Sequence, residues 1–193
     1  MSGEQHSQDP VSERVGEGPI AVGSRVPEAC ADLVDTDGSV STVSLSALAD
    51  DRPVLLCFYT MDFSPDCVKQ WCAFRDFDWF ASGDHVQVVG VSRSGVRLHR
   101  EFISRFDLGF PLYADPDLDI SDAFGVTYRT LGVTKRSRRS CFLLDASREV
   151  RYRWLADHWL DPTRDLPPVS EIHEAVVSEV GPEVDDFGFR TDG

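Results

Sequence analysis

Lysine is scarce in this chain, which has only Lys69 and Lys135 among its 19 basic residues. Acidic residues number 33, so the chain carries a net charge of -14 at pH 7. A surface of this sign repels the phosphates of nucleic acids and anionic membranes, and we expect neither as a partner. An acidic excess with so little lysine is typical of a halophile-type surface from a salt-rich cytoplasm, although a GC-rich gene would explain the arginine bias alone.

Long apolar runs are also missing. No stretch approaches the roughly 18 apolar residues of a membrane-spanning helix, and residues 1–20 contain no apolar run of signal-peptide length. The hydrophobic fraction of 41% is nevertheless ordinary for a globular protein. The sequence therefore predicts a cytoplasmic protein with one domain over residues 20–180, between a disordered acidic tail over 1–19 and a flexible acidic tail over 181–193.

The cysteines show no regular spacing along the chain. The five cysteines are odd in number and irregularly spaced, which argues against a secreted disulfide scaffold. Neither they nor the five histidines show metal-ligand spacing, so we expect no metal and no cofactor. Cys30, Cys57 and Cys141 fall in apolar, strand-like contexts, where packing in the core is commoner than redox work.

Short apolar runs alternate with helix-like segments along the chain. Two runs on either side of Thr36-Asp37-Gly38 predict an N-terminal β-hairpin, and a second hairpin around residues 145–148 precedes a closing helix. This order predicts an α/β fold with a mixed central sheet and helices on both faces. The expected strands are Val26–Val34, Val40–Leu45, Val54–Tyr59, Val86–Ser92, Pro111–Ala114, Ser140–Leu144 and Val150–Trp154, and the expected longer helices are Pro65–Ala81, Val96–Phe106, Leu118–Phe124 and Val169–Val180.

The most informative segment is the junction between the strand at residues 54–59 and the helix that follows it. Pro65 suits a first helical position and Ser64 suits the N-cap before it. Cys67 then lies in the first helical turn, where unpaired N–H groups and the helix dipole favour a thiolate. Cys67 is therefore a candidate nucleophile, although an isolated cysteine is more often a buried structural thiol.

The same junction resembles the active-site loop of the peroxiredoxins, whose pattern is Pro-x-x-x-Thr/Ser-x-x-Cys and which here reads Thr60-x-x-x-Ser64-x-x-Cys67. The spacing from Cys67 to Cys72 is similar to that of the PrxQ or bacterioferritin comigratory protein branch. Two later stretches also resemble this branch, Phe110–Pro116 followed by Ala123–Val126, and Arg139–Asp145. The resemblance extends from about residue 23 to about residue 177.

The resemblance implies a thioredoxin-like fold and a role for each matching residue. Cys67 would attack the peroxide, and Cys72 on the same helix would resolve the product as a disulfide that thioredoxin or a similar dithiol reduces. A helix terminus stabilises an anion by only about 0.3–1 kcal/mol, so a cation is also needed, and the motif makes Arg139 the choice. The Ser64 hydroxyl would hold the peroxide oxygens. Thr60 stands where the family has proline, which leaves the rate and the peroxide preference open.

Non-catalytic interpretations also remain for several of these residues. Cys72 could be an inert helix cysteine, Arg139 a surface charge and Thr60 a passive strand end. For the function, the first hypothesis is a thiol peroxidase acting on hydrogen peroxide and small organic hydroperoxides. The second is a thioredoxin-like disulfide oxidoreductase or redox sensor, and the absence of a Cys-x-x-Cys motif argues against it. A third possibility is a non-catalytic interaction domain derived from a peroxidase. The sequence leaves the choice between monomer and homodimer open.

Overall fold

The computed structural model describes residues 18–83, 85–130, 134–157 and 165–180, so the predicted tails lie outside the described residues except for residues 18 and 19. In the described part of the chain, none of the helices is long and apolar enough to cross a bilayer. The elements in chain order are β1 (Cys30–Val34), β2 (Val40–Ser44), α1 (Leu45–Leu48), β3 (Val54–Phe58), α2 (Pro65–Arg75), α3 (Asp78–Ser82), β4 (Gln87–Ser92), α4 (Val96–Phe106), β5 (Leu112–Ala114), α5 (Asp119–Ala123), β6 (Thr127–Thr130), β7 (Thr134–Ser137), β8 (Ser140–Leu144), β9 (Val150–Leu155) and α6 (Val169–Val180).

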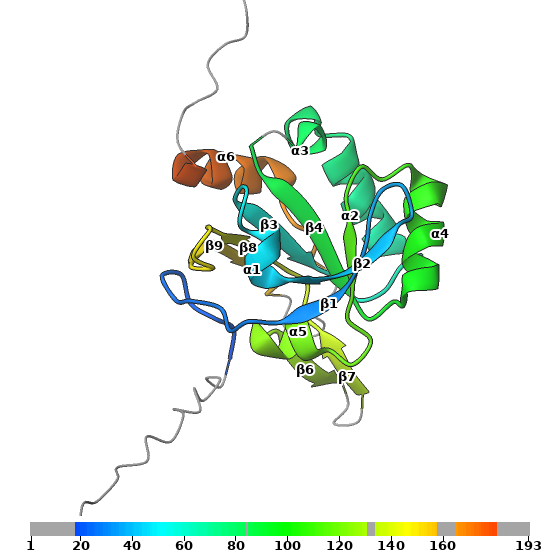
Figure 1. Ribbon diagram of the computed structural model, residues 1–193, viewed down its shortest axis with the longest axis horizontal. Coiled ribbons are helices and arrows are strands. Elements are labelled where there is room, and N and C mark those ends of the chain that lie inside the picture. Colours follow the sequence, from blue (N-terminus) through cyan, green and yellow to red (C-terminus); the bar gives the residue numbers. More distant parts are fainter. Residues whose placement is uncertain (1–17, 84, 131–133, 158–164, 181–193) are drawn as a thin grey trace, which may run out of the picture.

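Seven of the strands form one mixed sheet in the order β2-β1-β5-β4-β3-β8-β9 (Figure 1). Strand β4 pairs in parallel with β3 and with β5, and the other neighbours pair antiparallel. The short β6–β7 hairpin is separate from this sheet and lies with α5 at one end of the molecule. The mixed central sheet that the alternation of strands and helices predicted is confirmed.

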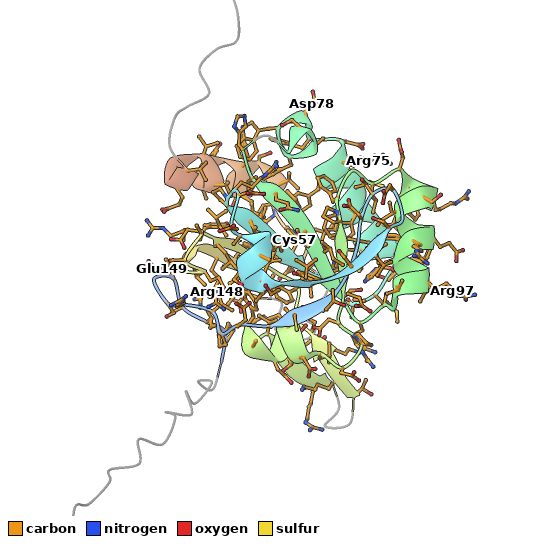
Figure 2. The ribbon with its side chains drawn as sticks, in the orientation of Figure 1. Cys57, Arg75, Asp78, Arg97, Arg148 and Glu149 are labelled. Carbon is orange, nitrogen blue, oxygen red and sulfur yellow. The ribbon has the colours of Figure 1, made fainter. Side chains whose placement is uncertain are left out.

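Strand β3 is buried on both faces, which explains its uninterrupted apolar sequence. Leu55 and Cys57 face a core that α2, α3, α4 and α6 cover. Leu56 and Phe58 face a second core beneath α1 and α5. In Figure 2, Cys57 lies at the middle of the sheet, whereas the charged Asp78 and Arg97 lie at the periphery. The end of this rigid, buried strand therefore gives a fixed starting point for the loop that leads to α2.

The predicted helix Pro65–Ala81 is broken in the structure. Helix α2 ends at Arg75, and α3 begins at Asp78. Between them Phe77 takes an extended conformation, with φ -100° and ψ 99°, and its ring packs on Phe80 and His173. The apolar period that continued through the break reflects this packing rather than one helix. The predicted helices Val96–Phe106 and Val169–Val180 are confirmed as α4 and α6.

The N-terminal hairpin is confirmed, with Gly38 at φ +82° in its turn, but its first strand begins at Cys30 instead of Val26. The prediction that Cys30 packs in the core is wrong, because its side chain is exposed. Cys30 pairs with Ser44 of the edge strand β2, and β1 becomes buried only at Leu33 and Val34. The buried positions of Cys57 and Cys141 confirm the prediction for the other two cysteines.

Cys57 and Cys141 face each other across β3 and β8, and the thiol of Cys141 donates to the Cys57 sulfur over 3.5 Å. Burial raises the pKa of the Cys57 thiol well above its ordinary range, and its neighbour Cys141 adds to the shift. Because the thiolate is the reactive form, both cysteines should resist iodoacetamide in the folded protein while the exposed Cys30 is modified. Peptide mass spectrometry after alkylation checks this, and denatured protein, in which all five cysteines react, is the control.

Candidate active site

The loop between β3 and α2 carries Thr60 and Ser64, two of the five predicted catalytic residues, and leads into the helix that carries Cys67 and Cys72. Pro65 occupies the first turn of α2 and Ser64 is the N-cap residue, with φ -69° and ψ 140°, as predicted. The Ser64 side chain makes no capping hydrogen bond, so its carbonyl oxygen, which accepts from the Val68 N–H over 2.9 Å, is what joins it to the helix. The hydroxyl instead lines a pocket beside the helix end.

Cys67 is at the third position of α2 and its side chain is fully buried. The backbone N–H groups of a first helical turn have no partner within the helix, and they point toward the N-terminal end. Together with the helix dipole they favour negative charge at this end of α2. Negative charge that develops at this position during a reaction is therefore stabilised by the end of the helix.

Arg139 lies directly before β8, and its backbone carbonyl accepts from the Ala156 N–H over 2.9 Å. Its side chain is only 1% exposed, which rules out the interpretation of a surface charge. Nη2 donates to the Cys67 sulfur over 3.5 Å, and Nη1 donates to Oε1 of Gln70. The structure thus brings the guanidinium of Arg139, 72 residues further along the chain, into contact with the Cys67 thiol, as the sequence predicted.

Thr60 also reaches the sulfur, because its Oγ1 lies 3.9 Å from Sγ of Cys67. Thr60 follows the buried Tyr59, whose N–H donates to the Val91 carbonyl over 3.0 Å and ties the end of β3 to β4. The position where the family has proline therefore presents a hydroxyl to Cys67.

A pocket of about 270 Å³ lies beside the N-terminal end of α2, and three of its lining residues, Ser64, Pro65 and Asp66, come directly before Cys67. Its lining includes Thr60, Ser64, the buried Arg139, and two further arginines, Arg93 and Arg136. Arg93 is held by a bond from Nη1 to the Lys135 carbonyl over 3.2 Å. With three arginines against one carboxylate, that of Asp66, the lining of the pocket is basic in a chain of net charge -14. Arg136 and Thr134 of this lining come from strand β7. Sequence analysis did not predict the β6–β7 hairpin to which this strand belongs.

Cys72 lies five residues after Cys67 on α2, is partly buried and has a free thiol. Two residues five apart on a regular helix are separated by about 8.6 Å between Cα atoms. A disulfide needs about 4.4–6.8 Å. The two cysteines therefore share a helix, as predicted, but the folded helix keeps them too far apart to form a bond.

Sequence analysis missed three buried polar residues near the site. Gln70, one turn after Cys67, is 1% exposed and orients Arg139. Its spacing from Cys67 on a face shared with Phe74 was the signal that could have identified it. Asp62, in the loop, and His99, on α4, are also buried and paired. Within the described residues, no group of three or more His, Cys, Asp or Glu side chains could hold a metal ion.

Comparison with known proteins agrees with this geometry. The model of the AhpC/TSA family matches residues 22–153. A putative peroxiredoxin of Mycobacterium tuberculosis is 35% identical over 108 residues, 55% of this chain and 69% of the relative. The chloroplastic peroxiredoxin Q of Oryza sativa subsp. japonica is 34% identical over 136 residues, 70% of this chain and 59% of the relative.

Two solved structures show the same fold. Peroxidoxin BcpB of Mycobacterium tuberculosis superposes with a TM-score of 0.64 at 26% identity, covering 81% of this chain and 94% of the other. Peroxiredoxin Q of Xanthomonas campestris superposes with a TM-score of 0.66 at 22% identity, covering 79% and 92%. Both are thioredoxin-fold peroxiredoxins, so the thioredoxin-like architecture is confirmed.

These findings define a class: the protein is a thiol-dependent peroxidase, an oxidoreductase with a peroxiredoxin fold. The family match covers well over half of its length, and the chain belongs to the AhpC/TSA family. Its relatives within that family include proteins named peroxiredoxin Q and peroxiredoxin bcp.

Proposed function

We propose that the protein reduces hydrogen peroxide and small organic hydroperoxides with Cys67 as the attacking thiolate and Cys72 as the resolving thiol. The observation that carries this proposal is the contact between Arg139 Nη2 and the Cys67 sulfur, 3.5 Å apart, at the N-terminus of α2. Positive charge from both the helix end and the guanidinium converges on one sulfur. The pocket beside this end of α2 is small, as peroxides of this class require.

In the first step the Cys67 thiolate attacks one oxygen of the peroxide, and the O–O bond breaks. The sulfur gains an S–O bond and becomes a sulfenic acid, while the second oxygen takes up a proton and leaves as water or alcohol. In this proposal the Ser64 hydroxyl and the Cys67 N–H donate to the oxygens, and Arg139 stabilises the charge as it moves from sulfur to oxygen. Thr60 offers a further hydroxyl at the sulfur.

In the second step the Cys72 thiol attacks the sulfenic sulfur, forming a disulfide and releasing water. Because the helical spacing of about 8.6 Å is too long for this bond, the first turn of α2 must unwind in each cycle. An external dithiol such as thioredoxin would then reduce the disulfide and allow the turn to reform.

The alternative of a disulfide oxidoreductase has less support from the site. Exchange with a protein disulfide needs an attacking sulfur that a partner protein can reach, and the Cys67 side chain is fully buried. A small peroxide can enter through the pocket, whereas a folded partner cannot. The burial of Cys67 therefore favours peroxide as the oxidant.

One equivalent of hydrogen peroxide added to the reduced protein should produce a crosslink between Cys67 and Cys72, detected by peptide mass spectrometry. The Cys72→Ser variant is the matched control, since it should accumulate a sulfenic acid at Cys67 that a dimedone probe captures. A crosslink of Cys67 to any other cysteine would contradict the resolving role of Cys72. An unmodified Cys67 would reject the peroxidase mechanism itself.

A further inference from the structure

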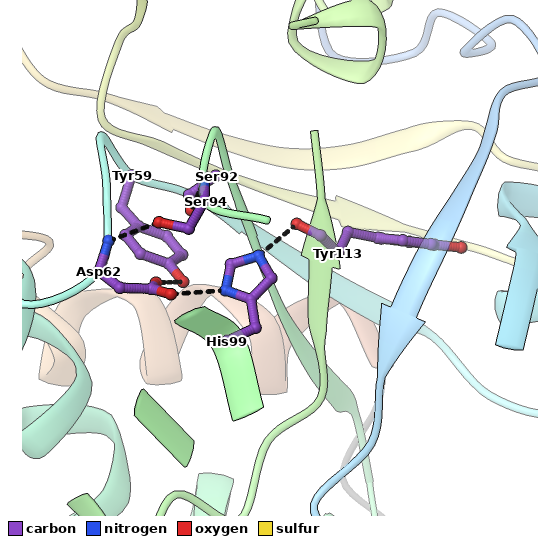
Figure 3. Close-up of polar contacts among 6 residues, drawn as sticks. All are labelled: Tyr59, Asp62, Ser92, Ser94, His99 and Tyr113. Atoms are coloured by element: carbon purple, nitrogen blue, oxygen red, sulfur yellow. Dashed lines mark hydrogen bonds and ion pairs between the residues drawn. The ribbon is translucent and has the colours of Figure 1, made fainter. Parts of the chain in front are cut away.

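A buried polar cluster lies behind the active-site loop, and nothing in the proposed chemistry uses it. It consists of Tyr59, Asp62, Ser94 and His99, and Figure 3 shows the carboxylate of Asp62 at its centre. The side chains of Asp62 and His99 are both 0% exposed. Burying a carboxylate costs free energy unless hydrogen bonds and charge pairing compensate for the lost hydration, so a cluster of this kind indicates a structural or functional role.

Three elements meet at Asp62. Its Oδ1 accepts from the Tyr59 hydroxyl over 2.7 Å, at the end of β3. Its Oδ2 lies 2.9 Å from Nδ1 of His99 on α4. Its backbone N–H donates to the Ser94 hydroxyl over 2.9 Å, in the turn between β4 and α4. Asp62 thus joins the loop to both neighbouring segments of the fold.

The proton arrangement in this cluster follows from its partners. His99 Nε2 lies 3.1 Å from the Tyr113 carbonyl, which can only accept, so Nε2 carries a hydrogen. Nδ1 and Asp62 Oδ2 must then share one further proton, because two lone pairs would otherwise face each other. Burial, and after it the charge of Asp62, raise the pKa of Tyr59 well above its ordinary range, so its hydroxyl remains a donor.

The loop has few other attachments. In the described part of the chain, no hydrogen bond between two backbone groups involves residues 60–63. Phe63 adopts φ +60°, a left-handed conformation that is unfavourable for a phenylalanine. Its ring packs on Phe102 and Phe106 of α4, the helix that also carries His99. Asp62 is therefore the main polar anchor of a strained loop.

We propose that Asp62 is a positioning residue that holds the loop so that the Thr60 hydroxyl faces the Cys67 sulfur and Ser64 lines the pocket beside it. Both hydroxyls are two residues from Asp62, one on each side, so a shift of Asp62 moves both. Misplacement of a reacting group by about 1 Å can cost about 100-fold in rate. This proposal rests on the proposed peroxidase function.

The test compares two reactions of the same sulfur, in a Cys30→Ser/Cys72→Ser background in which Cys67 is the remaining reactive cysteine. Oxidation by hydrogen peroxide depends on the positioned hydroxyls, whereas alkylation by iodoacetamide depends on the thiolate and on access to it, and not on those hydroxyls. With Asp62→Ala we expect peroxide oxidation to slow by about 10- to 100-fold and alkylation to change by less than about threefold. Ser94→Ala, a milder variant that removes one acceptor, should slow oxidation by about tenfold.

Asp62→Asn separates position from charge. The amide oxygen can accept from Tyr59 while its NH2 donates to a neutral His99, so the anchor is kept. We expect this variant to recover oxidation to within about threefold of the parent protein. Ser121→Ala is the matched control, because it removes another buried hydroxyl, which donates to Asp115 over 2.7 Å, far from the loop in sequence. It should oxidise at the parental rate, and thermal unfolding of every variant shows the stability lost in each.

The outcomes distinguish the two proposals. A parent protein whose Cys67 does not react with peroxide rejects the proposed function. If the parent reacts, parental oxidation rates in Asp62→Ala and Ser94→Ala reject the positioning role alone. Equal slowing in Asp62→Asn and Asp62→Ala would also overturn it, because the hydrogen bonds that the amide keeps would then not restore the rate. Alkylation that falls in parallel with oxidation would overturn it too, because the defect would then lie in the sulfur itself and not in the positioned hydroxyls.

Discussion

Replacing Cys67 with serine should abolish peroxide consumption, lowering turnover by about 10³-fold or more. A serine hydroxyl ionises far above neutral pH, and neither the end of α2 nor the guanidinium of Arg139 can compensate for that difference. The fold should survive, because serine is slightly smaller than cysteine and Arg139 keeps its contact with Gln70. Coupled peroxide consumption with thioredoxin and its reductase measures the effect.

Two matched variants make this result specific to Cys67. Cys30→Ser alters an exposed cysteine on β1 and should turn over at the wild-type rate. Cys72→Ser should complete one oxidation and then stall, because the sulfenic acid has no resolving thiol. Sustained turnover by Cys67→Ser would reject the assignment of the nucleophile, whichever reductant is used.

Replacing Arg139 with glutamine should slow the oxidation of Cys67 by about 10²- to 10³-fold, the cost of removing one charged donor from a preorganised site. Burial opposes a charged thiolate, and a helix terminus contributes at most about 2 kcal/mol against that cost. We therefore expect the guanidinium, 3.5 Å from the Cys67 sulfur, to supply a large share of the stabilisation of negative charge there. Stopped-flow fluorescence of the buried Trp71, on the same helix, can follow the reaction.

The neighbouring arginine is the control for this prediction. Arg138 donates to the Ala156 carbonyl over 2.7 Å and lies 3.6 Å from Asp157, so it shares the local chain but faces away from Cys67. Arg138→Gln should change the oxidation rate by less than about threefold, since its ion pair is largely exposed. Equal slowing in both variants would mean that net positive charge near the pocket, and not the contact of Arg139, drives the reaction.

Local pattern was enough to predict much of the fold and the centre of the site. The uninterrupted apolar run of β3 and the helical periods of α4 and α6 are consequences of burial that can be recognised in a few adjacent residues. Ser64, Pro65 and Cys67 depend on the geometry of one helix end, which is also local. Arg139 was predicted through the family motif and not through any local rule.

Residues that act across the chain were beyond the reach of local pattern. The exposure of Cys30 depends on how far along β1 other segments bury the strand. The break between α2 and α3 depends on the packing of Phe77 against α6. Gln70 looks like an ordinary polar helix residue until Arg139 is placed above it. His99 was judged by metal-ligand spacing, although its partner Asp62 is distant in sequence.

The sequence by itself determined the α/β alternation, the acidic charge and a thiol at a helix N-terminus, because each follows from neighbouring residues and their hydrogen-bonding needs. Only the tertiary structure decided which side chains meet at that thiol. Folding brings together the end of β3, the start of β8 and one face of α4, and the contacts of Arg139, Thr60 and Asp62 depend on burial that no single segment can provide.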